Sequence, residues 1–160
     1  LIVLAIIICM CLTGCRSERF VNDITQVIYT SDSGTILPEL QWHEEVVIAK
    51  NEVSLIRNGR VENSGINSGV WKISIDEQKT AALFAQLRSV DCSKIKRVEP
   101  DIMPDGGGTV SFTIVYTDNR KCSLIYDPGT VYTNGQLIKK PIEEFIKNLV
   151  FPSGVKYQYK

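Results

Sequence analysis

The sequence has no excess of charge of either sign and very little histidine. Eighteen lysine and arginine residues balance eighteen aspartates and glutamates over 160 residues, and His43 is the only histidine. A chain without net positive charge lacks the long-range attraction that holds a polyanion, so we expect no nucleic-acid partner. The uncharged apolar run at residues 1–14 is also shorter than the about 20 residues that a membrane-spanning helix needs.

The chain has the composition of one folded domain. Hydrophobic residues make up 44% of the sequence and charged residues 22%, which argues against disorder. A length of 160 residues is usual for a single domain, and no internal repeat or low-complexity tract interrupts the chain. We therefore expect one globular domain over residues 24–150, followed by a C-terminal tail at 151–160.

The first fourteen residues form an apolar leader. They carry no charge, and twelve of them are apolar, which is typical of the central part of a secretory signal peptide. The run ends in Leu12-Thr13-Gly14-Cys15, and this motif resembles the lipobox of a bacterial lipoprotein precursor. The resemblance implies cleavage before Cys15 and attachment of a diacylglyceryl group to its sulfur. The alternative is that residues 1–14 form an apolar helix or strand of the domain itself.

The lipobox resemblance also implies a location. Two acyl chains hold a protein stably on a bilayer, so we expect a protein anchored to a membrane by lipid, on the extracytoplasmic side of the cell envelope. Residues 15–23 would be the lipidated N-terminus and a polar tether. Arg16 stands where an aspartate would signal retention at the inner membrane, so the outer membrane is favoured if the cell is Gram-negative. Neither an initiator methionine nor a basic segment precedes the leader, so we expect further residues ahead of Leu1.

Only two of the five cysteines remain for the domain after cleavage and lipidation. In an oxidising compartment an even pair favours a disulfide, here between Cys92 and Cys122. The alternative is that Cys122 is a small buried residue of a strand and Cys92 a partly covered residue at a helix end. Two thiols and one histidine cannot complete the four-ligand shell of structural zinc without carboxylates, so we expect no metal and no cofactor.

Alternating apolar residues and turn signals predict an antiparallel sheet. A first strand is expected near residues 24–30. A two-residue turn at Lys50-Asn51 would pair Ile48 with Val53 and Val46 with Leu55. Asn58-Gly59 predicts a type I′ turn, followed by a short strand over residues 60–63.

Two further strand segments complete the predicted sheet. Residues 70–75 place Trp71, Ile73 and Ile75 on one face of a half-buried strand. A second hairpin is predicted with a three-residue loop at Asp118-Asn119-Arg120. That loop would pair Tyr116 with Cys122, Ile114 with Leu124, and Phe112 with Tyr126.

Two amphipathic helices are expected, at about 75–90 and 141–150. Ser74-Ile75-Asp76-Glu77 has the form of a capping box, and Pro141 is typical of a first helical position. Together with the hairpins, these helices predict an α+β fold, in which about six or seven antiparallel strands carry both helices on one side. This layout, with Gly69-Val70-Trp71 before a capped helix, resembles small bacterial lipoprotein domains of unassigned function. The resemblance implies no catalytic residues.

The only histidine lies within Trp42-His43-Glu44-Glu45, beside two carboxylates. A carboxylate can orient an imidazole as a general base or as a metal ligand. Adjacent strand residues point to opposite faces, so Glu45 could share a face with His43 while Glu44 could not. No motif marks a nucleophile, and the alternative is a surface histidine ahead of a strand. We therefore assign no catalytic residue.

The segment from 98 to 108 combines carboxylates with three consecutive glycines: Glu99, Asp101, Asp105, Gly106, Gly107 and Gly108. Such a loop could gather oxygen ligands for calcium or present backbone N–H groups to an anion, but the spacing fits neither an EF-hand nor a P-loop. The alternative is a flexible turn that leads into a strand. Because long loops on a rigid scaffold often carry function, we expect partner contact here.

These features favour a non-enzymatic binding or accessory module of the cell envelope, held at the membrane by its lipid. Its partner would be an envelope protein or a cell-wall component, met through the sheet face or the 98–108 loop. A structural subunit of envelope assembly is the alternative. A hydrolase that uses His43 with nearby carboxylates is a third hypothesis.

Overall fold

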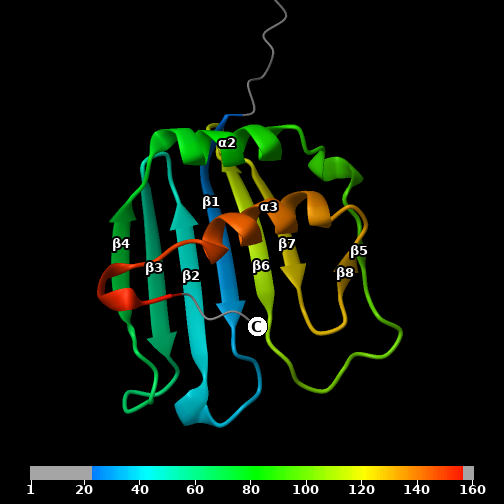
Figure 1. Cartoon of the computed structure of the whole chain (residues 1–160). Coiled ribbons are helices and arrows are strands. Elements are labelled where there is room, and N and C mark those ends of the chain that lie inside the picture. Colours follow the sequence, from blue (N-terminus) through cyan, green and yellow to red (C-terminus); the bar gives the residue numbers. More distant parts are fainter. Residues whose placement is uncertain (1–22, 157–160) are drawn as a thin grey trace, which may run out of the picture.

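A six-stranded antiparallel sheet forms the centre of the protein (Figure 1). The structure is a computed structural model that describes residues 23–156. The leader, Cys15 and the tether up to residue 22 lie outside the described residues. The strands lie in the order β4-β3-β2-β1-β6-β7, with the bounds β1 Ile24–Asp32, β2 Trp42–Ile48, β3 Glu52–Gly59, β4 Gly69–Ser74, β6 Val110–Tyr116 and β7 Lys121–Tyr126.

Two helices, α2 (Glu77–Arg88) and α3 (Gln136–Lys147), cover one face of this sheet (Figure 1). The predicted α+β fold with both helices on one side is therefore confirmed. The smaller elements are a two-stranded sheet of β5 (Arg97–Val98) and β8 (Val131–Tyr132) and three 3-10 turns, η2 (Pro38–Leu40), η3 (Cys92–Lys94) and η4 (Pro152–Gly154). Within residues 23–156, no helix is both long enough and apolar enough to cross a bilayer.

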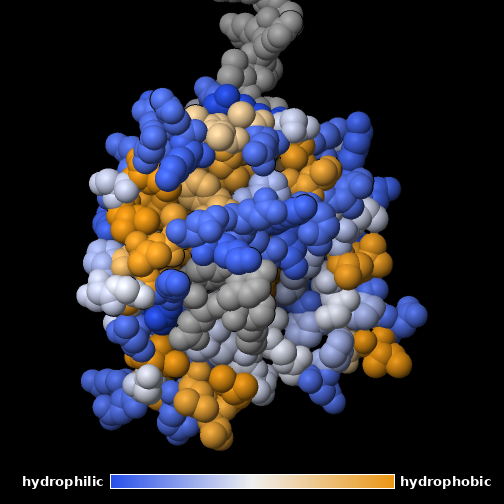
Figure 2. Space-filling view, in the orientation of Figure 1, coloured by the Kyte–Doolittle hydropathy of each residue, from blue (hydrophilic) through white to orange (hydrophobic). Residues whose placement is uncertain are grey.

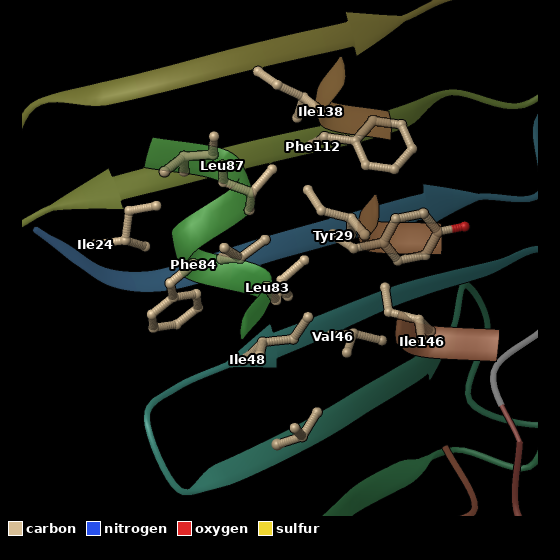
Figure 3. Close-up of a cluster of buried hydrophobic side chains, with 14 of the residues drawn as sticks. Ile24, Tyr29, Val46, Ile48, Leu83, Phe84, Leu87, Phe112, Ile138 and Ile146 are labelled. Atoms are coloured by element: carbon tan, nitrogen blue, oxygen red, sulfur yellow. The ribbon is translucent and has the colours of Figure 1, made fainter. Parts of the chain in front are cut away.

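The hydrophobic core lies between the sheet and the two helices (Figure 3). Every second residue of each central strand points to this face, as the period of a β-strand requires. The core includes Val27, Tyr29, Val46, Ile48, Leu55, Phe112 and Ile114 from the strands and Leu83, Phe84, Leu87, Ile138, Ile142 and Ile146 from the helices. Phe151 and Val155 are buried too, so the chain packs with the domain beyond residue 150.

The predicted pairing of the first hairpin is confirmed. Ile48 lies opposite Val53, and Val46 lies opposite Leu55. All four side chains are fully buried on the core face. A slip of one residue would turn them to the other face of the sheet, so their burial holds this register.

The predicted turn at Asn58-Gly59 is wrong. Both residues belong to β3, where Asn58 pairs with His43, and neither has the positive φ of a type I′ turn. The backbone of β3 pairs with β2 along the whole length of β2, up to Gly59 opposite Trp42. Residues 60–63 consequently form a turn and not the expected strand, and the next strand is β4.

For the second hairpin, the prediction of which side chains face the core is confirmed, but the predicted pairing register is wrong. Ile114 lies opposite Cys122 and Phe112 opposite Leu124, two residues away from the predicted partners. The loop is centred one residue earlier, so that Asn119 takes the left-handed conformation at φ 63°. Asparagine tolerates this conformation better than most residues. Because the shift is an even number of residues, the apolar side chains remain on the core face.

The first helix begins differently from the prediction. The N-cap of α2 is Asp76, whose carboxylate accepts a hydrogen bond of 2.8 Å from the backbone N–H of Gln78. Ser74 remains in strand β4, so the predicted capping box is wrong. An aspartate at the cap performs the same role, since its oxygen satisfies an N–H group that the helix leaves free.

The final helix begins five residues before the predicted position. Its first residue is Gln136, and Pro141 lies inside the helix. The proline cannot donate to the carbonyl of Leu137, four residues earlier. Leu137 lies on the exposed side of the helix, where water can bond to that carbonyl, so the proline does not end the helix. The predicted start at Pro141 is therefore wrong.

Candidate functional site

Three loops meet at one end of the sheet, which we call the distal end: residues 33–41, 60–68 and 99–109. Strand β1 enters the domain at Ile24 and runs to Asp32, next to the first of these loops (Figure 1). Nine strand residues with a rise of about 3.3 Å each separate the two ends by about 30 Å. The distal end therefore lies far from the point at which the chain enters the described domain.

The loop at 33–41 contacts both of the other loops. The backbone N–H of Gly65 donates to the carbonyl of Glu39, and that of Arg60 donates to the carbonyl of Gln41. On the other side, a Cβ atom at Gly34 would lie only 1.9 Å from the carbonyl oxygen of Gly107, and Gly34 has a φ of +80°. Only glycine fits this close approach, which joins the loop at 33–41 to the glycine-rich segment of the loop at 99–109.

Large apolar side chains are exposed on two of these loops. On the loop at 99–109, Ile102 is 84% exposed and Met103 is 55% exposed. On the loop at 33–41, Leu37 is 67% exposed, and Ile36 and Leu40 are exposed beside it. Figure 2 shows hydrophobic areas over both loops at the distal end. Grouped exposed apolar side chains of this kind are typical of interaction sites.

Arg97 attaches the base of the loop at 99–109 to strand β7. Its guanidinium donates to the backbone carbonyl of Ile125 at 3.0 Å and to the carboxylate of Asp127 at 2.6 Å, and it also bonds to Glu99. Asp127 accepts a further hydrogen bond of 3.0 Å from the hydroxyl of Thr109, at the other end of the loop. Both ends of the loop are thereby fixed, and Glu99 belongs to this anchor and not to the exposed tip.

The same contacts lower the pKa values of two carboxyl groups. The guanidinium of Arg97 lowers the pKa of Glu99, and Arg97 together with Thr109 lowers the pKa of Asp127. In each case hydrogen bonds to the charged form outweigh the opposing effect of desolvation. Both carboxylates are consequently charged in the folded protein at neutral pH.

We expect the stabilisation from this anchor to disappear in acid. Because the folded pKa values lie below the unfolded ones, the contribution is present above the unfolded values of about 4 and is lost as the pH falls through the folded values. The melting temperatures of the wild type and of Arg97→Met should therefore differ at pH 7 and converge as the pH falls below about 4. A difference that stays constant down to about pH 2 would contradict this role for Arg97.

The distal end is acidic although the whole chain is neutral. Its three loops contain five carboxylates and one cation, Arg60. The guanidinium of Arg60 donates to the side-chain oxygen of Gln41 at 2.6 Å. All five carboxylates are exposed, and four of them form no ion pair within residues 23–156: Glu39, Glu62, Asp101 and Asp105. Negative charge therefore accompanies the exposed apolar side chains.

A hollow of about 400 Å³ lies beside the loop at 33–41. It is lined by His43, Asp32, Gln41, Asn58 and Arg60 among others. Nδ1 of His43 lies 2.8 Å from a carboxylate oxygen of Asp32, and both side chains are about half exposed. The pair leaves Nε2 of the imidazole available for a ligand, so the hollow can bind a polar group.

The carboxylate that contacts His43 comes from a different part of the chain than the sequence suggested. Glu44 points to the core face and pairs with Arg57, while Asp32 of β1 lies directly opposite His43. Nine residues separate Asp32 from β2, so the register of these two strands has no short turn to define it. The one signal in the sequence was the alternation of apolar and polar residues along β1. It indicates which side chains of β1 lie on the same face of the sheet as His43.

The residues of the predicted partner-contact loop lie at the distal end but do not form a metal site. Asp101, Asp105, Gly106 and Gly107 are exposed, and Gly106 and Gly107 have positive φ. Within residues 23–156, no group of three or more histidine, cysteine, aspartate or glutamate side chains has the geometry to hold a metal ion. The neighbouring Ile102 and Met103 are also exposed, and neither the carboxylates nor the run of glycines in this segment indicates that.

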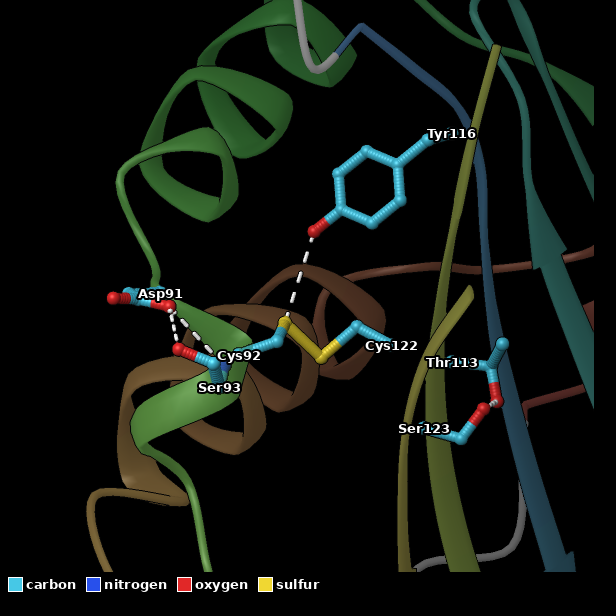
Figure 4. The surroundings of a disulfide bond; sticks show 7 residues. All are labelled: Asp91, Cys92, Ser93, Thr113, Tyr116, Cys122 and Ser123. Carbon is cyan, nitrogen blue, oxygen red and sulfur yellow. Dashed lines mark hydrogen bonds between the residues drawn. A yellow bond between two sulfur atoms is a disulfide. The ribbon is translucent and has the colours of Figure 1, made fainter. Parts of the chain in front are cut away.

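Cys92 and Cys122 form a disulfide (Figure 4). The bond joins η3, which follows helix α2, to strand β7, with Cα atoms 6.2 Å apart. The hydroxyl of Tyr116 lies 3.7 Å from Sγ of Cys92. The predicted pairing is therefore present, and it links the helical layer to the sheet at the end opposite the distal loops.

The chain was compared with models of protein families, with curated proteins and with solved structures. None of the three comparisons produced a match.

Proposed function

We propose that this protein is a lipid-anchored binding module of the cell envelope, which contacts a partner protein through its distal end. The apolar leader and the motif Leu12-Thr13-Gly14-Cys15 support the anchor and the extracytoplasmic location. The observation that carries the binding role is the exposure of Ile102, Met103 and Leu37 on loops that are fixed to the fold. The function is non-enzymatic.

The direction of the chain supports this division of roles. A lipid at Cys15 would precede the domain by a short tether, which reaches β1 at the end opposite the distal loops. Nine residues of β1 then separate the membrane side from the distal loops by about 30 Å. An anchor at one end leaves the other end accessible to a second envelope component.

The contacts of the distal end favour binding over catalysis. His43 and Asp32 have the arrangement of a base and its orienting carboxylate, but a hydrolase of this type also needs a nucleophile beside the imidazole. Ser33 lines the same hollow, but its hydroxyl accepts a hydrogen bond of 3.1 Å from the backbone N–H of Trp42. A polar hollow next to exposed apolar loops fits partner recognition better.

Mass spectrometry and crosslinking in the native host test the two parts of this proposal. The intact mass should correspond to a chain that begins at an acylated Cys15, and C15S should retain the leader. A photo-crosslinking residue placed at Leu37 or at Met103 should capture one and the same protein in native membranes. The matched control is Glu144, an exposed residue of α3.

Each part of the proposal has a result that would contradict it. A free Cys15 thiol in the purified protein would remove the anchor and the extracytoplasmic location. Equal capture from Leu37, Met103 and Glu144, or capture from Glu144 alone, would remove the distal end as the binding surface.

A further inference from the structure

We propose that the distal end binds a basic, apolar segment of its partner protein. The inference rests on the proposed function and adds the chemistry of the partner. It comes from the combination of two features at the distal end: large apolar side chains exposed on two of its loops, and carboxylates that form no ion pair within residues 23–156.

The first argument is the separation of charge within a neutral chain. Eighteen basic residues balance eighteen acidic ones overall, yet the three distal loops hold five carboxylates and only Arg60 as a cation. Elsewhere most exposed carboxylates are paired, as Glu52 is with Lys72 and Glu77 with Lys50, and the exposed Asp76 caps helix α2. Among the residues that the structure describes, 23–156, Glu39, Glu62, Asp101 and Asp105 have no such pair. Complementary charge across an interface accelerates association and selects the partner, so lysine and arginine residues are expected opposite these four.

The second argument is the position of the apolar side chains between these carboxylates. Glu39 is flanked by Leu37 and Leu40, and Ile102 and Met103 lie between Asp101 and Asp105. A partner that carried only positive charge would leave these apolar side chains in water. A segment that carries both lysine or arginine and apolar residues buries them, and the removal of apolar surface from water favours binding.

The layout of the distal end favours a segment that reaches more than one loop. Figure 2 shows the two hydrophobic areas over separate loops of this end. The close approach of Gly34 to Gly107 places those loops side by side. The hollow beside Gln41 and Asn58 lies next to the loop at 33–41 and offers amide and carboxylate oxygens to a donor.

The same charges exclude a lipid surface as the occupant. Anionic lipid surfaces attract basic segments and repel carboxylates. Four exposed carboxylates at the distal end would be repelled from such a surface. The partner is therefore a protein segment and not the bilayer.

Peptide binding to the lipidated full chain in neutral nanodiscs tests the inference, with empty nanodiscs as the blank. The probe is a labelled ten-residue peptide in which lysine, leucine and serine repeat. One control peptide replaces each lysine with glutamate, and the other replaces each leucine with serine. Fluorescence anisotropy should show binding of the probe at least about tenfold tighter than that of either control.

Charge reversal locates the binding. In E39K/D105K the affinity for the probe should fall at least about tenfold, whereas E144K on helix α3 should leave it within about twofold. Raising the salt from about 50 mM to about 500 mM should weaken binding to the wild type, because exposed charges are screened. If the first variant fails to fold, E62K/D101K provides the same test, since neither side chain forms an ion pair with another residue of the described range 23–156.

Each other outcome overturns the inference. Equal affinity for the basic and the acidic peptide, or no effect of charge reversal at the distal end, would show that the loops do not select a basic partner. If crosslinking from Leu37 and Met103 still captures a native protein in that case, the proposed function stands and only the chemistry of the partner is wrong. If crosslinking fails there as well, both are wrong.

Discussion

Replacing Arg57 with alanine is expected to lower the free energy of unfolding by about 3 to 5 kcal/mol. Arg57 and Glu44 lie opposite each other on the core face of β3 and β2, where their side chains are 5% and 0% exposed. The guanidinium also donates to the backbone carbonyl of Lys156 at 2.7 Å, and its Cζ lies 5.7 Å from the centre of the Trp71 ring. Its removal takes the Arg57 cation away from the buried carboxylate of Glu44, which is costly.

The buried pair can be compared with a surface pair on the same sheet. Lys72 and Glu52 form an exposed ion pair at 2.9 Å, so Lys72→Ala should change the stability by less than about 1 kcal/mol. Urea unfolding of both variants, followed by tryptophan fluorescence, gives the two values. Replacing Arg57 by methionine and Glu44 by leucine together should cost less than Arg57→Ala alone, because no buried charge remains. Equal losses from Arg57→Ala and Lys72→Ala would contradict this account.

Removal of the disulfide is expected to cost about 3 to 4 kcal/mol of stability. The bond between Cys92 and Cys122 closes a segment with a sequence separation of 30 residues. In the chain-entropy account, opening this loop gives the unfolded chain many more conformations. C92A/C122A should therefore unfold at a lower concentration of urea than the wild type.

Reduction provides the matched control for that variant. Addition of a thiol reductant should lower the urea midpoint of the wild type towards that of C92A/C122A. The double variant, which has no bond to lose, should not respond. An unchanged midpoint of the wild type after complete reduction would show that the loop closure contributes nothing to stability.

Local patterns were sufficient for several parts of the fold. The pairing of Ile48 with Val53 follows from a two-residue turn between alternating apolar segments, and it is confirmed. The helix over α2 follows from the spacing of Leu83, Phe84 and Leu87, all of which are buried. In both cases the residues that interact are close in the sequence, so few competing arrangements exist.

Other parts depend on partners that are distant in the sequence. The strand ladder along β2 extends β3 through Asn58-Gly59, where the dipeptide by itself favours a turn. The contacts of His43 with Asp32 and of Arg57 with Lys156 join residues 11 and 99 positions apart. A pattern within one segment contains no information about such pairs.

The order of apolar and polar residues by itself determined that this chain forms an α+β domain with both helices on one side, and which faces of its hairpins are buried. It did so because side-chain burial follows the short periods of strands and helices. Tertiary structure alone decided that the loops at 33–41, 60–68 and 99–109 meet at one end, and that their carboxylates and apolar side chains share a surface. That assembly depends on the order of the strands in the sheet, which brings together loops separated by many residues.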